Sequence, residues 1–306
     1  MSNLKIYNFM GPRKIAAALS VVLLVISIGS LAFNGLKLGL DFTGGSLVEV
    51  GYEQPANLNE IRDQLKSAGY DDAVVQTFGS PTDILIRLGR DHDPKLGDKV
   101  VSALQQHSDE TLTLRRNEFV GAQVGEELRE QGGLGMLLAL FMIMVYVAFR
   151  FQMKFSVGAV AALAHDVLIV LGFFSLFGIE FDLTVLAAVL AVIGYSLNDT
   201  IVVSDRIREN FRKMRKGTPI EIMNHSLSQT LGRTLVTSLT TLLVLVALAV
   251  FGGEMIHGFA LALLVGVFIG TYSSIYVAAN VLIAMGVCKE DLMPPEKDEE
   301  EVDDRP

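Results

Sequence analysis

Asp199 carries the clearest chemical signal in this sequence, because it is a carboxylate within the otherwise apolar run 183–203. An ionised carboxylate is costly in hydrocarbon, so a carboxylate retained there indicates a functional site by default. Asn198 stands next to it, and Arg233 comes just before the following apolar run. Groups of this kind can hold a proton or exchange one.

A second polar pair, His165 and Asp166, interrupts the apolar run 157–177. Asp166 lies about nine residues from one end of that run, or roughly 13 Å along a helix, which is close to mid-membrane. Adjacent helical residues point about 100° apart. We therefore expect His165 and Asp166 to contact different neighbours or a shared water molecule.

Two interpretations of these polar groups stay open. In the first, Asp199 and Arg233 form a static pair between helices, since a long arginine side chain can extend along the bundle, and Asp166 is capped by serine or threonine. In the second, one of the two carboxylates gains and loses a proton, and the pathway includes Asp199, Asn198, His165, Asp166 and Arg233. Two carboxylates with a histidine and an arginine favour the second.

The composition predicts that these residues lie in a membrane protein. The 306 residues are 51% hydrophobic, the mean hydropathy is +0.44, and the apolar residues form long blocks. Runs long enough to cross about 30 Å of hydrocarbon lie at 15–33, 134–149, 157–177, 183–203, 235–251 and 256–287. We therefore predict a membrane α-helical bundle of six transmembrane helices.

Basic residues orient this bundle. Lysine and arginine are enriched before the first run, between the second and third, and throughout 204–234. The positive-inside rule makes these segments and both termini cytoplasmic, and places residues 34–133 outside. The first run exceeds a usual signal sequence, so we predict an uncleaved anchor. Residues 134–287 form the remaining five-helix region, with a basic cytoplasmic loop at 204–234.

The sequence pattern of residues 34–133 predicts one small α+β domain. Strand and helix patterns alternate in the order βαββαβ, which is typical of a ferredoxin-like fold. The domain contains no apparent catalytic set, and Asp91, His92 and Asp93 fit a solvated turn better than a metal site. We therefore predict a protein that is not an enzyme and needs no metal or cofactor.

Other features of the sequence suggest packing or solvated segments. Gly266 and Gly270 form a GxxxG pattern, which allows close approach of helices. The single cysteine, Cys288, excludes an internal disulfide. Residues 288–306 form an acidic tail, and the formal net charge of -9 argues against a nucleic-acid partner.

Several of these motifs together resemble the SecD/SecF family of bacterial protein-export membrane subunits, in its shorter SecF type. The resemblance covers the chain from the first span to the last. It rests on Leu38-Gly39-Leu40-Asp41-Phe42-Thr43-Gly44-Gly45, Ala164-His165-Asp166-Val167, Tyr195-Ser196-Leu197-Asn198-Asp199-Thr200 and Ser204-Asp205-Arg206-Ile207-Arg208-Glu209-Asn210.

The resemblance implies a place in the inner membrane beside the SecYEG channel, in complex with SecD and YajC and surrounded by lipid. It implies that the proton-motive force helps to move a preprotein in transit. Asp199 and Arg233 match the family positions assigned to proton transport. We interpret Asp41, Phe42, Thr43, Gly44 and Gly45 as a structural junction that transmits motion, because its glycines permit tight turns.

Two alternatives come from other functional classes. SecD and SecF are similar to halves of resistance-nodulation-division transporters, so a half-transporter that exports small molecules is one. A non-transporting scaffold that stabilises the translocon is the other. The scaffold predicts that neutralising Asp199 or Arg233 damages assembly before it damages proton coupling.

Overall fold

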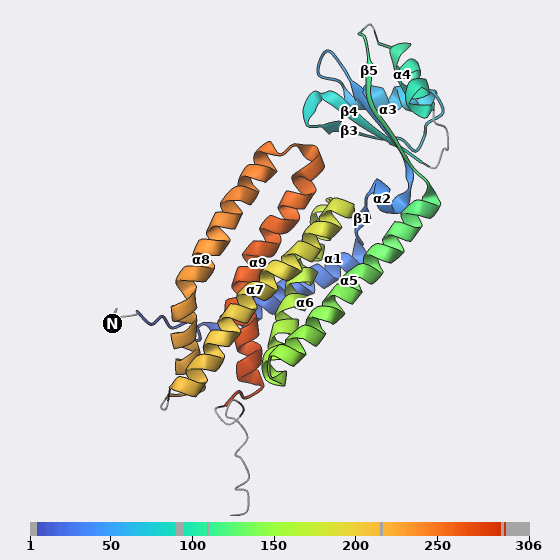
Figure 1. The fold of residues 1–306 in the computed structure, drawn as a ribbon. Helices are drawn as coiled ribbons and strands as arrows, with labels where there is room; N and C mark the ends of the chain where they lie inside the picture. The colour runs from blue at the N-terminus through green and yellow to red at the C-terminus, as the bar shows by residue number, and fades with distance from the viewer. Residues whose placement is uncertain (1–4, 90–94, 109, 215–216, 289–290, 292–306) are drawn as a thin grey trace, which may run out of the picture.

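The computed structural model describes residues 5–89, 95–108, 110–214, 217–288 and 291. The possible metal residues 91–93 and the end of the acidic tail lie outside this part. Long helices form a bundle, and a small sheet domain lies beyond one end of it (Figure 1). The chain enters the sheet domain from α1 and leaves it through α5.

Within the described residues, six helices are long and apolar enough to cross a membrane, as the sequence predicts. Connections between successive helices are short for the last five of them, so these neighbours in sequence run in opposite directions (Figure 1). The helices are α1 (Arg13–Phe33), α5 (Ala122–Arg150), α6 (Met153–Phe177), α7 (Leu183–Lys213), α8 (Pro219–Phe251) and α9 (Glu254–Ala284).

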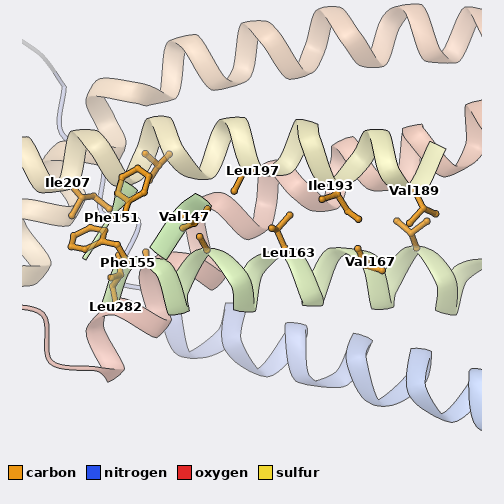
Figure 2. Packing of buried hydrophobic residues seen from close by; sticks show 14 of the residues in the cluster. Val147, Phe151, Phe155, Leu163, Val167, Val189, Ile193, Leu197, Ile207 and Leu282 are labelled. Carbon is orange, nitrogen blue, oxygen red and sulfur yellow. The ribbon is translucent and has the colours of Figure 1, made fainter. Parts of the chain in front are cut away.

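The centre of the bundle is formed by α6 and α7, with α9 packed against both. Figure 2 shows Val189, Ile193 and Leu197 of α7 facing Leu163 and Val167 of α6. By contrast, α5 and α8 bury little of their surface and expose many large apolar side chains. A helix that is apolar on its exposed side is suited to lipid or to another membrane subunit.

Three helices extend further than the sequence predicts. Residues 204–234, predicted as a loop, are almost entirely helical, because α7 continues to Lys213 and α8 begins at Pro219. Thr218 starts α8 with a capping box that includes Glu221. Likewise, α5 begins at Ala122 rather than near 134. Hydropathy indicates only the apolar part of a helix, and each of these helices continues beyond its apolar part into polar residues.

The GxxxG residues lie where α9 meets α7. A Cβ atom added at Gly266 would overlap Cγ2 of Val192, and one at Gly270 would lie 3.1 Å from Cβ of Ser196. Because α7 and α9 run in the same direction, the two contacts repeat at the same four-residue spacing on both helices. The glycines therefore allow the two backbones to approach closely.

We expect Gly266→Ala to destabilise the bundle, because the new methyl group would overlap Val192. Overpacking of this kind costs about 1–3 kcal/mol, measurable as a lower free energy of unfolding in detergent micelles. Gly232→Ala on α8 is the matched control, since a Cβ there meets nothing within 4 Å. Equal stability of the two variants would contradict this account of the α7–α9 contact.

The sheet domain has the βαββαβ order predicted from the sequence. Its strands pair antiparallel in the order β3-β4-β2-β5. The two helices pack on one face of the sheet around buried Val48, Ile84, Ile86, Leu65 and Leu104. The elements are β2 (Gly45–Gly51), α3 (Leu58–Ser67), β3 (Val74–Phe78), β4 (Ser80–Leu88), α4 (Leu96–Gln105) and β5 (Thr113–Val120).

Three short elements join the sheet domain to the bundle. After α1, the chain forms β1 (Lys37–Leu38) and the single-turn helix α2 (Leu40–Thr43) before it enters β2. Strand β1 pairs in parallel with β6 (Glu180–Phe181), which lies between α6 and α7. This two-stranded sheet was not predicted, because strands of two residues have no periodicity to detect.

Candidate functional site

Asp199 lies within the membrane-spanning part of α7, with a side chain that is only 5% exposed. Its Oδ2 atom is buried and has no hydrogen-bond partner among the described residues. An unpaired buried carboxylate oxygen is expensive in a low-dielectric environment. The Oδ2 atom of Asp199 thus has no hydrogen-bond partner among the described residues that would fix the carboxylate in one protonation state.

The expected direct pair between Asp199 and Arg233 does not form in this arrangement. The Arg233 side chain is exposed on α8, and within the described part of the chain no ion pair joins it to Asp199. The next residue, Thr234, is buried instead. Arg233 still attracts the carboxylate through space. The static pair of the first interpretation is therefore not formed in this structure, because Arg233 does not lie on the buried side of α8.

The polar neighbours expected to support Asp199 lie elsewhere. Asn198 is exposed, and the hydroxyl group of Thr237 donates to carbonyl oxygens of its own helix. Ser238 is buried, accepts a hydrogen bond from the Tyr195 hydroxyl at 3.3 Å and lies 2.7 Å from the hydroxyl of Thr271. Ser238 therefore joins α7 to α8 and α9, one helical turn away from Asp199.

Asp166, in contrast, has a full set of partners. Its Oδ2 atom accepts hydrogen bonds from Ser196 of α7 at 2.5 Å and from Ser273 of α9 at 2.7 Å. Its Oδ1 atom lies 2.9 Å from Nδ1 of His165. His165 and Asp166 thus contact each other, which the 100° separation did not predict, while their other neighbours differ. This cluster ties three helices together with charge-assisted hydrogen bonds.

Tyr272 of α9 connects His165 of this cluster to α1. The His165 ring lies 6.3 Å from the ring of Tyr272, centroid to centroid. The Tyr272 hydroxyl donates to the Ala16 carbonyl oxygen at 2.6 Å and lies 3.0 Å from the hydroxyl of Ser20. Tyr272 and Ser273 were not predicted as site residues from the sequence. The run of hydroxyl residues at 271–274, within the last apolar block, could have indicated them.

The predicted junction, residues 41–45, has an unusual backbone. Gly44 and Gly45 have φ values of 68° and 131°, a region that side chains beyond glycine rarely adopt. A Cβ atom at Gly45 would lie 2.7 Å from the Leu88 carbonyl oxygen. Glycine is therefore required where α2 turns into β2.

Asp41 and Phe42 connect this junction to the bundle. Oδ2 of Asp41 accepts a hydrogen bond from the backbone nitrogen of Leu183 at 3.1 Å. Leu183 is the first residue of α7, so the carboxylate also complements the positive end of that helix dipole. The rings of Phe42 and Phe181 stack with centroids 6.1 Å apart. The junction therefore holds the N-terminal end of the helix that carries Asp199.

A cleft of about 480 Å³ separates the open face of the sheet from the end of the bundle that faces it. Two contacts between described residues bridge it. Arg87 of β4 forms an ion pair with Glu180 of β6, and Arg116 of β5 donates to the Met255 sulfur atom of α9 at 3.1 Å. The sheet domain therefore rests on the bundle through few polar contacts, with space between them.

Comparison with known proteins identifies the family. Residues 100–287 match the model described as "Protein export membrane protein SecD/SecF, C-terminal", and residues 29–56 match the model of the SecD/SecF GG motif. The chain belongs to the SecD/SecF family. The GG-motif match contains the junction 41–45, and the C-terminal match contains α6 to α9 with both carboxylates.

Within the SecD/SecF family, the chain is similar over its whole length to proteins named protein translocase subunit SecF. It is 57% identical to that of Pseudomonas aeruginosa, covering 99% of this chain and 100% of the relative. It is 52% identical to that of Vibrio alginolyticus, with 99% and 98% covered. It is 47% identical to that of Escherichia coli O157:H7, with 98% and 94% covered. The chain is therefore a SecF-like member.

Solved SecDF structures share the fold of this SecF-like chain. The crystal structure of SecDF from Thermus thermophilus, a translocon-associated membrane protein, matches with a TM-score of 0.85 at 38% identity. The match covers 93% of this chain and 39% of the SecDF chain. SecDF in a super-membrane-facing form matches with a TM-score of 0.69 at 39% identity, covering 92% and 39%. The SecF-like chain thus spans well under half of each SecDF chain.

Proposed function

We propose that this SecF-like translocase subunit couples proton movement through the membrane to late steps of preprotein translocation, and catalyses no covalent reaction. The observation that carries the proposal is Asp199, a buried membrane carboxylate whose Oδ2 has no fixed partner among the described residues. A group of that kind can change its protonation state without first breaking a hydrogen-bond network.

The two carboxylates have different roles in this proposal. Asp166 is held by Ser196, Ser273 and His165, so its environment supports a structural role that keeps α6, α7 and α9 together. Asp199 is the group that exchanges the proton, with Arg233 as the nearby cation. Gain of a proton at Asp199 weakens its attraction to Arg233 and frees α7 to move relative to α8.

Helix α7 transmits that movement. It is continuous from Leu183 to Lys213, and Asp199 lies 16 residues from its outer end, or about 24 Å at 1.5 Å per residue. The outer end is bonded to Asp41, directly before the glycine turn into β2. A shift of α7 therefore reaches the sheet domain through a rigid helix and a junction that can turn.

Two further findings support movement of the sheet domain relative to the bundle. The two SecDF structures differ in TM-score, 0.85 against 0.69, at nearly the same sequence identity, so they differ in arrangement more than in relatedness. The cleft between sheet and bundle gives the domain room to move. Movement of a periplasmic ferredoxin-like domain against a preprotein in transit would pull or release it on the outer side.

Partners and orientation are part of the proposal. Arg233 and Asn198 are polar yet exposed on membrane helices, which is costly unless another subunit covers them. SecD is the partner we propose for that face, with SecYEG and YajC in the same assembly and lipid around the remaining apolar surface. Both termini lie in the cytoplasm, as the distribution of basic residues indicates.

Reconstituted inner-membrane vesicles test the proposal. Vesicles containing SecYEG and SecD are compared with and without this chain, while protease protection measures the amount of translocated preprotein. We expect the chain to increase translocation only while a proton gradient is present, and an ionophore to remove that gain. A gain that survives the ionophore would favour the scaffold, and a gain in small-molecule efflux alone would favour the half-transporter.

A further inference from the structure

Among the described residues, the buried side-chain oxygen atoms without a hydrogen-bond partner include one on α7 and one on α8 that carry this inference. One is Oδ2 of Asp199, and the other is Oγ1 of Thr234. Their side chains are 5% and 1% exposed, respectively. Each of these atoms pairs well with water, and a buried polar atom left unpaired is unfavourable.

The helix register places the two residues in the same layer. Tyr195 of α7 is hydrogen-bonded to Ser238 of α8, and the two helices run antiparallel. One turn onward from Tyr195 is Asp199, and one turn back from Ser238 is Thr234, so these two residues lie on the same faces as the bonded pair. Further along, the bond from Asn210 to Ser226 continues the antiparallel register.

Thr234 also differs from the other threonines within α8. The hydroxyl groups of those residues donate to carbonyl oxygens of their own helix, which is the usual solution for threonine in an apolar helix. They are Thr230, Thr237, Thr240 and Thr241. The Thr234 hydroxyl makes no such bond, so it is available to a ligand at the helix interface.

We propose that Thr234 holds a water molecule against the carboxylate of Asp199 and is a positioning residue of the proton site. The water bridges Oγ1 of Thr234 and Oδ2 of Asp199. When it arrives as hydronium, it gives one proton to the carboxylate and remains as neutral water, and the reverse step releases the proton. The charged or titratable groups near this layer include Arg233 from α8, Tyr195 one turn away on α7, and His165 with Asp166 from α6. The neighbouring part of α9 contributes the hydroxyl groups of Thr271 and Ser273.

The role in proton exchange rests on the proposed function, but the water site itself does not. Infrared difference spectra of the chain in proteoliposomes after a pH step test the site directly. Bands from the Asp199 carboxyl group are identified by their absence in Asp199→Asn. A bound water gives an O–H stretching band that shifts in H₂¹⁸O. We expect that band in the wild-type chain.

Matched variants assign the water to Thr234. Thr234→Val removes the hydroxyl at nearly constant shape, and we expect it to abolish the water band and to move the Asp199 C=O band to higher wavenumber. Thr234→Ser keeps the hydroxyl and should retain both bands. Thr237→Val is the control, because that hydroxyl bonds only within its helix. A water band that persists in a folded Thr234→Val protein would overturn the proposal.

Translocation in the vesicle assay separates the two proposals. If both are correct, Thr234→Val lowers gradient-dependent translocation at least about threefold, and Thr234→Ser restores it. If Asp199→Asn leaves translocation unchanged, the proposed function fails, while the infrared bands still decide the water site. If the bands are lost but translocation is unaffected by Thr234→Val, Thr234 binds water without positioning the proton, which overturns its assigned role.

Discussion

Asp199→Asn should reduce the gradient-dependent part of preprotein translocation by at least about tenfold, the effect expected when the group that carries the essential step is removed. Asparagine keeps the size of the side chain but cannot take up and release the proton. The part of translocation that does not depend on a proton gradient should stay at the wild-type level. Protease protection of a preprotein in vesicles, with and without an ionophore, measures both parts.

Asp205→Asn is the matched control for this experiment. Asp205 is on the same helix, but its side chain is 43% exposed and forms a long ion pair with Arg150 at 3.5 Å. Exposed pairs of this kind contribute little, so we expect translocation to stay near the wild-type level. Normal gradient-dependent export by a stably inserted Asp199→Asn chain would refute the assignment of Asp199.

Asp166→Ala should cause the largest loss of stability among the substitutions considered. It leaves Ser196 and Ser273 without their acceptor and separates His165 from its carboxylate, all within the bundle. Removing one member of a buried charged network costs about 3–5 kcal/mol. The free energy of unfolding in detergent micelles, or the yield of folded protein after extraction, measures the loss.

Asp166→Asn distinguishes lost hydrogen bonds from lost charge. The amide keeps one acceptor oxygen for a serine hydroxyl, so it should lose less stability than alanine does. A loss below about 0.5 kcal/mol for Asp166→Ala, which is the range of ordinary surface substitutions, would show that the cluster does not hold the helices. Asp166 would then become a candidate for proton exchange beside Asp199.

The sequence determined much of this protein without help from tertiary structure. Apolar runs predicted six spans because a membrane imposes a minimum length on a helix. Alternating periodicities predicted the βαββαβ order, since each pattern depends on neighbours in the chain. The cost of charge in hydrocarbon identified Asp199, Asp166 and His165 as unusual from their surroundings alone.

Contacts between distant segments depended on the tertiary structure. The pairing of Ser196 and Ser273 with Asp166 joins residues from three helices, and the hydrogen bond from the Leu183 backbone to Asp41 joins segments 142 residues apart. The rotation of α8 about its axis buries Thr234 and exposes Arg233, adjacent residues of which the sequence favoured Arg233 as the partner of Asp199. Helix rotation and register result from packing over the whole interface, so local sequence predicts which helices form but not which side chains meet.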